Sequence, residues 1–357
     1  MAKPLNTAEI GVALIGAGMI APTHIAALSA LRPRLGLRAI VSQRPERAMH
    51  YASQYAGPAP LFTADLAQVT DDPTIKMAIV ATPPSVRIDL ITALAQSGTH
   101  ILLEKPVART LDEAQQVVDI CNRAGVTLGV LFQHRMRAPS LAAARLIADG
   151  NLGKLGHVEI AAPLWRDQSY YDELGRGTYA RDGGGVLLTQ AIHTIDLALS
   201  LTGPAAGPVT TVRAMTATSP LHQMEAEDFA VAGLTFANGA VGSLVASTAS
   251  FPQRPETITL HFEHASLRVG TSDLNLMWRD GRPCADAQIT GTATDTGPTI
   301  AKHEWHQAVI DDFATALRNN RPPLVSGQTA LAAHQLITAI ETSSRTGQPV
   351  TLSPPQG

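Results

Sequence analysis

The first third of the chain alternates short apolar runs with helical patterns, and this alternation constrains the fold more than any other feature. The runs are rich in aliphatic and β-branched residues, as buried strands are: GVALIG, LRAIVS, KMAIVAT, THILLE and VTLGVLF. The stretches between them, such as PERAMHYASQYA and TLDEAQQVVDICNRAG, have helical patterns. Repeated strand–helix units predict a doubly wound parallel sheet over residues 1–132.

The chain changes character after about residue 132. A helical pattern and a polar, aromatic loop lead to a second predicted helix, VLLTQAIHTIDLALSLTG. From about Val209 to Trp278 the pattern becomes β, and FANGAVGS carries an Asn-Gly hairpin signal. Two helices are expected near 302–319 and 327–346. This pattern predicts that residues 133–357 form an α/β domain with a mostly antiparallel, open-faced sheet and helices on one face. The C-terminal helices of this domain can pack back on the first domain.

A glycine-rich turn follows the first predicted strand, in ALIGAGMIAPTHIAAL. Gly16 permits the tight turn, and Gly18 lets the backbone approach a pyrophosphate at the start of the helix. Ala21 supplies the small third residue that close packing of helix on strand requires. After the first strand of an α/β run this motif predicts a dinucleotide site, with Gly16, Gly18, Met19 and Ile20 in the turn.

The end of the second strand, IVSQRPER, bears on the choice of cofactor. A carboxylate there would bind the ribose 2′-hydroxyl, whereas an arginine suits a 2′-phosphate. Ser42, Gln43 and Arg44 offer donors, and the first carboxylate is Glu46. We therefore expect NADP, with NAD as the alternative because Gln43 can also bind a bare ribose.

Composition excludes several classes of protein. A formal net charge of -3 gives no basic footprint for nucleic acid. The 12 histidines are scattered without zinc-ligand spacing, so no metal site is expected, and Cys121 and Cys284 are too few for a disulfide framework. No stretch is long and apolar enough to span a bilayer, so no membrane partner and a cytoplasmic location are expected.

The segment HILLEKPVAR ends a predicted strand on Glu104, Lys105 and Pro106. Together with the glycine-rich turn, ATPPS after the preceding strand, DGGGVLLTQAIHTIDLALSL and the final TSSRTGQPV, this triplet resembles the Gfo/Idh/MocA oxidoreductases. The resemblance covers nearly the whole chain.

The resemblance implies a Rossmann domain followed by an open-faced domain whose sheet makes the contacts of a homodimer or homotetramer. It implies hydride transfer between NAD(P) and a hydroxyl carbon of a sugar or cyclitol. The residues at the places of Lys105 and His193 are the usual acid–base groups of the family, and the Lys-Pro bond is often cis. Thr82, Pro83, Glu104 and Lys105 are expected to lie against the cofactor.

The chemistry of the reaction fits these residue types. Oxidation of a secondary alcohol removes a hydride from carbon and a proton from oxygen, and the reverse step protonates an alkoxide. An ordinary lysine has a pKa near 10.4, which partial burial and a nearby positive nicotinamide would lower. Glu104 would oppose that lowering if it pointed at the ammonium, and it can instead face the cofactor or a backbone donor.

The chain departs from the family pattern at two positions. Thr189 stands where many relatives carry Asp four residues before the histidine, and Arg87 stands where many carry a histidine. Threonine cannot act as a carboxylate base, so proton transfer falls on Lys105 and His193. Asp196, nearly one turn after His193, is expected either to orient it or to pack the helix.

The loop WRDQSYYDELGRGTYARDGGG is rich in arginine and tyrosine and precedes the helix of His193. We expect substrate contacts from side chains of this loop and of the following helix: Trp165, Arg166, Tyr170, Tyr171, Arg176, Thr189 and Gln190. With His134 and Arg135 they predict a polar, cationic environment for a sugar, sugar acid or cyclitol.

Three alternatives stay open at this point. The first is a carboxylated cis-dihydrodiol dehydrogenase of the same family, and the second is a non-catalytic nucleotide-sensing module. The third is a hydrolytic or eliminating enzyme that uses a tightly held cofactor transiently.

Overall fold

The computed structural model of the protein describes residues 9–283, 289 and 303–352, which form two compact units. The first contains the described residues of Met1–Ala108, Asp112–Gln133 and Thr299–Leu331. The second contains those of Arg109–Leu111, His134–Pro298 and Ala332–Gly357. Residues 303–331 thus belong to the first unit, although they fall within the range 133–357 predicted for the second domain.

The sheet of the first unit has six parallel strands in the order β3-β2-β1-β4-β5-β6. This order is that of dinucleotide-binding folds, in which ligands lie at the carboxyl ends of the strands. β1, β4 and β5 are almost wholly buried, which explains their unbroken apolar sequences. The strands are β1 (Ile10–Ile15), β2 (Leu35–Val41), β3 (Leu61–Thr63), β4 (Ile75–Val80), β5 (His100–Leu103) and β6 (Leu128–Val130).

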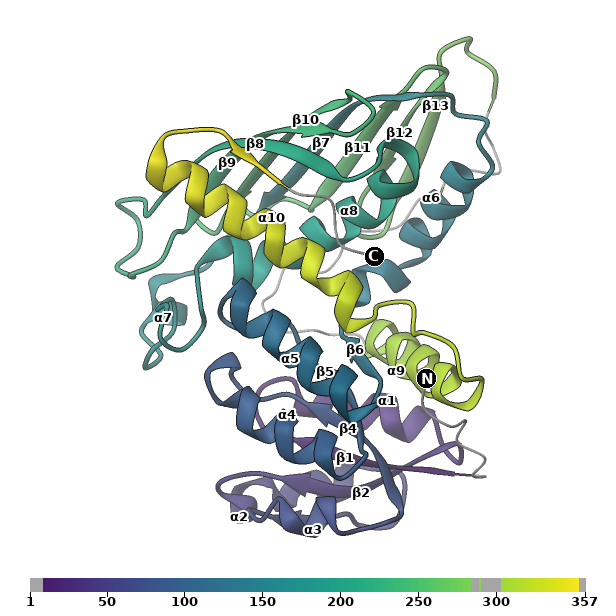
Figure 1. The fold of residues 1–357 in the computed structure, drawn as a ribbon, viewed down its shortest axis with the longest axis vertical. Helices are drawn as coiled ribbons and strands as arrows, with labels where there is room; N and C mark the ends of the chain where they lie inside the picture. The colour runs from purple at the N-terminus through teal and green to yellow at the C-terminus, as the bar shows by residue number, and fades with distance from the viewer. Residues whose placement is uncertain (1–8, 284–288, 290–302, 353–357) are drawn as a thin grey trace. The chain divides into compact units, whose positions relative to one another are not determined.

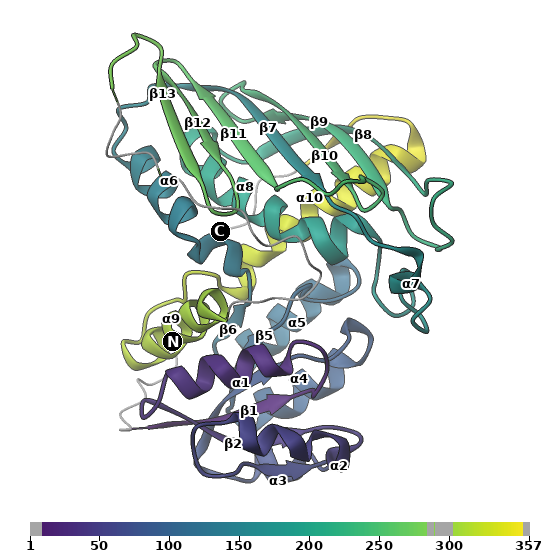
Figure 2. The same cartoon turned by 180° about the vertical axis from the view of Figure 1, so that it is seen from behind.

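Helices cover both faces of this sheet. Figure 1 shows α4 and α5 in front of it, and Figure 2 shows α1 and α9, which contact each other, on the opposite side. The helices and 3-10 turns of this unit are α1 (Ala21–Ala30), α2 (Pro45–Ala48), η1 (Met49–Gln54), α3 (Ala67–Thr70), η2 (Pro84–Val86), α4 (Arg87–Gln96), α5 (Leu111–Ala124) and α9 (Glu304–Arg318).

The second unit is built on an eight-stranded sheet in the order β13-β12-β11-β7-β10-β9-β8-β14. All neighbouring strands are antiparallel except β7 and β10. The strands are β7 (Leu155–Pro163), β8 (Val209–Ala217), β9 (Phe229–Phe236), β10 (Val241–Ser247), β11 (Thr257–Phe262), β12 (Ala265–Val269), β13 (Leu274–Trp278) and β14 (Val350–Thr351).

One face of this second sheet carries the helices. α8 contacts β7 and β11, and α6 contacts β12 and β13 (Figure 1). Along β7 and β11 buried residues alternate with more exposed ones, so the face away from the helices is open along these strands. The remaining helical segments are η3 (Gln133–Met136), α6 (Ala138–Ala148), α7 (Gln168–Tyr171), η4 (Leu187–Ala191), α8 (Ile192–Ala206) and α10 (Gly327–Thr346).

The predicted fold class is confirmed, and two local predictions are corrected. The helix expected over PERAMHYASQYA is four residues of α-helix followed by a 3-10 segment; only Ala48 and Tyr51 of these two segments are buried, so little packing stabilises a regular helix there. The helix expected over VLLTQAIHTIDLALSLTG begins with a π-helical segment, η4. None of the described helices has the length and apolarity needed to cross a membrane.

Of the two cysteines, Cys121 belongs to the part of the chain that the structure describes. Cys121 is fully buried, and burial raises the pKa of its thiol to about 12, as expected for a small core residue. Cys284 lies outside the described residues.

Candidate functional site

The turn between β1 and α1 requires glycine at its first position. Gly16 has a φ of 110°, and a Cβ there would lie 2.7 Å from the carbonyl oxygen of Ala81. A Cβ on Gly18, in contrast, would meet no atom within 4 Å, so its backbone borders open space. Met19 is 73% exposed beside it. A backbone that borders open space at a helix N-terminus fits the predicted pyrophosphate position.

A pocket of about 270 Å³ lies at the carboxyl end of β2. It is lined by Ala17, Ser42, Gln43, Arg44, Arg47 and Ala48. The structure therefore brings the three predicted ribose-end residues together and adds Arg47, which the sequence had not singled out. Two guanidinium groups and no carboxylate line this pocket, so it fits an anionic group better than a bare ribose.

Thr82 and Pro83 follow β4 at the same edge of the sheet. The Thr82 hydroxyl is buried and has no hydrogen-bond partner among the described residues. A buried, unsatisfied hydroxyl is costly without a ligand or water to bond it. The position of this hydroxyl next to the Gly16 turn, where Gly16 closely approaches Ala81, fits a bound dinucleotide.

The predicted catalytic lysine lies just beyond β5. β5 ends at Leu103, Glu104 is buried and Lys105 is half-buried. The Lys105–Pro106 peptide bond is cis, as the resemblance implies. The segment therefore leaves the sheet at its carboxyl edge, where open α/β folds bind ligands.

Glu104 interacts with two buried histidines that the sequence analysis did not identify. His24 Nε2 donates a hydrogen bond to Glu104 Oε1 at 2.9 Å, and His306 Nε2 lies 3.8 Å from the same oxygen. Burial alone would raise the pKa of Glu104, but the His24 hydrogen bond and the nearby His24, His306 and Lys105 lower it to about 2. Burial also lowers the pKa of His306 to about 4. Glu104 is therefore a fixed anion next to Lys105 in sequence.

Arg87 holds the backbone around Lys105. Its side chain is 2% exposed and donates to the carbonyl oxygens of Thr82 (3.0 and 2.7 Å), Glu104 (2.6 Å), Pro106 and Val107 (3.4 Å). Burial lowers the pKa of this guanidinium to about 10. Because Arg87 bonds the carbonyls on both sides of Lys105, it fixes the path of the chain there. In the sequence, Arg87 stands out only as a departure from the family pattern.

His193 lies in the first turn of α8, directly after the π-helical segment η4. It is buried, and its ring stacks on that of His134 with centroids 4.6 Å apart. Within η4 the Thr189 hydroxyl lies 2.6 Å from the carbonyl oxygen of Gly185 and also contacts Gln190 Oε1. π-Helical segments often occur at functional sites, because they change the direction of the side chains around them.

Asp196 does not orient His193 by a hydrogen bond to it. Its carboxylate accepts a bidentate pair from Arg135, at 2.7 and 2.6 Å, and both side chains are largely buried. Of the two expected roles for Asp196, this geometry supports helix packing. Because the guanidinium of Arg135 pairs with Asp196, Arg135 does not contribute to the predicted cationic surroundings of a substrate.

Tyr170 is the centre of the predicted substrate loop. The guanidinium groups of Arg166 and Arg176 lie 5.7 and 4.8 Å from its ring centroid, and Gln190 Nε2 donates to its hydroxyl at 3.3 Å. Glu173 pairs with Arg176 at 2.7 Å, and the two neighbouring arginines of the loop lower its pKa. The loop is thus polar, but its positive charge is partly neutralised within itself.

The other two aromatic candidates are held by packing. Tyr171 is buried, its hydroxyl lies 2.6 Å from Thr248 Oγ1, and burial raises its pKa to about 12. Trp165 is half-buried, and its ring lies 5.7 Å from His222 and 5.4 Å from Phe251. Substrate binding by these two residues stays a prediction.

The predicted cofactor residues, with Lys105, lie in the first unit, whereas His193 and the predicted substrate residues lie in the second. Three residues that the sequence did not indicate belong to no local motif: His24 and His306, which are buried, and Arg47, which is exposed. Glu341 is another, because burial and nearby Glu227 raise the pKa of its carboxyl to about 7.

Comparisons with known proteins agree with this geometry. The family description "Oxidoreductase family, NAD-binding Rossmann fold" matches residues 10–132, and "GFO/IDH/MocA C-terminal domain" matches residues 140–268, together well over half of the chain. The D-apiose dehydrogenase of Paraburkholderia graminis is 29% identical over 352 residues, which cover 95% of this chain and 89% of that protein. The scyllo-inositol 2-dehydrogenase (NAD(+)) of Bacillus subtilis is 25% identical over 293 residues, with 82% of each chain covered.

A solved structure is similar along nearly its whole length. The WlbA dehydrogenase from Bordetella pertussis, in complex with NADH and UDP-GlcNAcA, has a TM-score of 0.81 and 29% sequence identity. The similarity covers 97% of this chain and 99% of that chain.

Proposed function

The chain belongs to the Gfo/Idh/MocA family of oxidoreductases, and from this premise we propose that it transfers a hydride between NADP and a secondary hydroxyl or keto group of a sugar or cyclitol. The predicted enzyme class, an NAD(P)-dependent dehydrogenase, is confirmed by the family and its named relatives. The substrate and the preference for NADP are the new parts of this proposal.

The pocket at the end of β2 carries the cofactor assignment. Ser42, Gln43, Arg44 and Arg47 line it and no carboxylate does. A 2′-phosphate would receive charge-assisted hydrogen bonds from the two guanidinium groups. The Gly16 turn would hold the pyrophosphate, and Thr82 and Pro83 would lie toward the nicotinamide end. Bound NADP would supply the hydride acceptor, and every proton must then be moved by the chain's own residues.

Lys105 and His193 are the residues proposed to move that proton. During oxidation Lys105 would take the hydroxyl proton as the hydride leaves, and in reduction it would return the proton to the developing alkoxide. His193 would hydrogen-bond the same oxygen. Thr189 offers a hydroxyl to the substrate and no carboxylate base, so the proton is not shared with a third ionised group.

The substrate class is inferred from the second unit. Tyr170, Gln190 and Arg176 form a connected polar group suited to hydroxyls. Because Glu173 pairs with both Arg176 and Arg181 and so reduces the positive charge of the loop, we rank a neutral polyol before a sugar acid or a carboxylated dihydrodiol. Oligomerisation through the eight-stranded sheet is part of the same proposal and rests on the family resemblance.

A binding measurement tests the cofactor assignment without a known substrate. We expect NADPH to bind at least about tenfold more tightly than NADH, by nicotinamide fluorescence. Arg44→Ala should raise the Kd of NADPH by about tenfold or more, because a hydrogen bond to a charged group contributes ~1.5–3 kcal/mol, and should leave the Kd of NADH nearly unchanged.

Arg38→Ala is the matched control for that variant. Arg38 lies on β2, pairs with Glu9 and does not line the pocket. A wild-type preference for NADH, or an equal effect of Arg38→Ala and Arg44→Ala, would overturn the assignment. A panel of sugars and cyclitols read by nicotinamide absorbance then tests the substrate class.

A further inference from the structure

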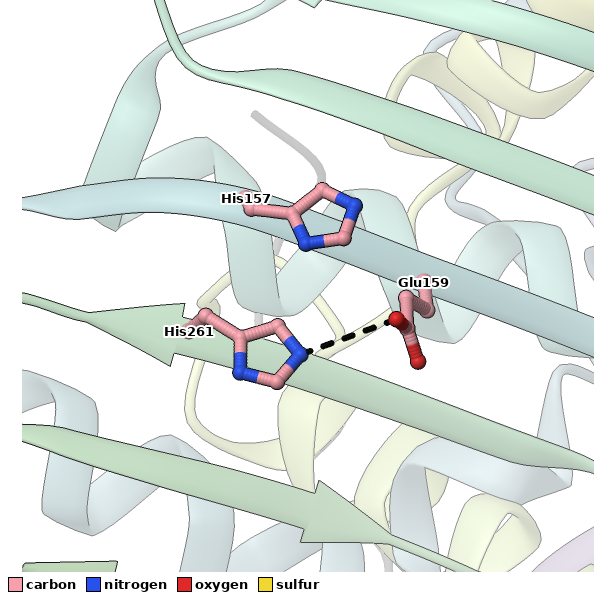
Figure 3. Close-up of side chains that lie close together, drawn as sticks. All are labelled: His157, Glu159 and His261. Carbon is pink, nitrogen blue, oxygen red and sulfur yellow. Dashed lines mark ion pairs between the residues drawn. The ribbon is translucent and has the colours of Figure 1, made fainter.

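Three side chains with metal-binding groups meet on the open face of the eight-stranded sheet (Figure 3). His157 and Glu159 lie two residues apart on β7, so they point to the same face of the sheet. β11 pairs antiparallel with β7, and its residue His261 lies directly opposite His157. The strand register therefore gathers two imidazoles and a carboxylate that the sequence separates by about a hundred positions.

The distances are close to those of a metal centre. The imidazole rings of His157 and His261 are nearly parallel, with centroids 5.2 Å apart and an interplanar angle of 9°. His261 Nε2 lies 3.8 Å from Glu159 Oε1, and one ligand atom from each of the three residues lies within 4.8 Å of the others. Ligands at about 2.0–2.2 Å from a tetrahedral ion are roughly 3.4 Å apart, so small side-chain rotations would complete the site.

A fourth residue orients one of the imidazoles. His261 Nδ1 lies 3.1 Å from the hydroxyl of Ser266, which is opposite it in the β11–β12 ladder. Metal-binding histidines usually bond a second protein group through the ring nitrogen that does not bind the metal. Here that bond leaves Nε2, the nitrogen on the Glu159 side, as the metal ligand.

An ion pair alone is a weaker explanation for this cluster. The side chains of His261 and Glu159 are 40% and 55% exposed, and ion pairs at such exposure contribute little to stability. A carboxylate alone does not explain two stacked imidazoles, because both would have to be protonated to pair with it and two imidazolium rings would repel each other. A shared cation satisfies all three groups at once.

We propose that His157, Glu159 and His261 bind one divalent d-block cation, with Zn²⁺ preferred. Two imidazoles and one carboxylate suit Zn²⁺, Co²⁺ or Ni²⁺ better than Mg²⁺ or Ca²⁺, which favour oxygen ligands. A hollow of about 670 Å³ is lined by His157 and His261, among others, so in the single chain solvent can supply the ion and the remaining ligands. The sheet, and not the nucleotide-binding unit, holds this site.

Metal titration of untagged protein, stripped beforehand with a chelator, tests the proposal. Competition with a chromophoric zinc indicator should show one Zn²⁺ per chain with micromolar affinity or better. His157→Gln and His261→Gln should each weaken binding at least about tenfold, and Ser266→Ala about tenfold, since loss of such an orienting partner typically costs that much. Co²⁺ should give visible absorption bands that Zn²⁺ displaces.

His264→Gln is the matched control, because His264 is an exposed histidine in the hairpin between β11 and β12. It should bind Zn²⁺ like the wild type. Absence of stoichiometric binding, or binding that His157→Gln and His261→Gln leave unchanged, would overturn the proposal. Circular dichroism of each variant separates lost ligands from lost folding, and His261→Gln should retain NADPH binding.

Discussion

Replacing Arg87 should separate its role in folding from its role in positioning Lys105. The guanidinium donates to carbonyl oxygens of Thr82, Glu104 and Pro106, and thereby ties the end of β4 to the segment after β5. Arg87→Met removes every donor, whereas Arg87→Lys keeps a charge that cannot fork to both segments. The two variants should therefore fail in different ways.

The magnitude follows from two opposing terms. Burial lowers the pKa of Arg87 from 12.5 to about 10, so holding the charge costs roughly 3 kcal/mol. Hydrogen bonding by this charged donor to the three carbonyl groups of Thr82, Glu104 and Pro106 contributes about 1.5–3 kcal/mol for each group, or roughly 5–9 kcal/mol. The difference, about 2–6 kcal/mol, is the expected loss of stability in Arg87→Met. At ~2–4 °C per kcal/mol, a loss near 3 kcal/mol lowers the Tm by roughly 6–12 °C.

Arg87→Lys should remain folded at room temperature but lose turnover. Displacement of Lys105 by about an ångström would reduce kcat by ~10–100-fold, while the Kd of NADPH should change by less than about threefold. The assays are thermal unfolding, nicotinamide fluorescence and steady-state kinetics with the best substrate of the panel. A kcat that falls together with a shifted pH profile indicates positioning, which a purely structural role would not produce.

Arg123→Met is the control for both variants, because Arg123 is an exposed arginine in the last turn of α5. It should match the wild type in every assay. The reasoning is refuted if Arg87→Lys has wild-type Tm and kcat, or if Arg87→Met is no less stable than Arg123→Met.

Three further substitutions test other parts of the account. Gly16→Ala should destabilise the protein by about 2 kcal/mol or more and weaken NADPH binding, since the position needs a positive φ; unfolding and fluorescence titrations measure this. The pKa of Glu341 is raised from 4.5 to about 7, so the contribution of this carboxyl to stability is present below pH 4.5 and lost as the pH rises through 7. Glu341→Gln should therefore be more stable than the wild type by up to ~3 kcal/mol at pH 8 and equal to it at pH 4.5, which a series of Tm measurements against pH checks. Asp196→Asn should cost ~3–5 kcal/mol in denaturant unfolding, because it leaves Arg135 buried without its anion; an unchanged midpoint would contradict the packing role.

The sequence predicted the first sheet well because its strands are buried on both faces. β1, β4 and β5 form unbroken apolar runs, and Gly16 marks the tight turn that follows β1. β3 was missed because it is only three residues long, with one buried position, and lies at the sheet edge. Local sequence patterns therefore suffice to predict a strand when all of its residues are buried.

The polar interior was not predictable, because it depends on contacts between distant segments. Nothing near His24 or His306 in sequence indicates that both approach Glu104. Arg87 looks like an ordinary first-turn arginine of a helix, and only the tertiary structure shows that it is buried against carbonyl oxygens.

The cluster of His157, Glu159 and His261 also depends on contacts between distant segments, which local sequence patterns do not reveal. A search for zinc ligands in sequence depends on short spacings. His157 and His261 lie on strands that become neighbours only through the register of β7 and β11. Composition and local spacing carry no information about such a pair.

The central claim, that Lys105 carries the proton in an NADP-dependent oxidation, is tested most directly by Lys105→Ala. Turnover of the best sugar or cyclitol should fall by ~10²–10⁴-fold, the range expected for loss of a general acid–base group, while the Kd of NADPH stays within about threefold of wild type. Turnover within a few-fold of wild type in this variant would contradict the claim.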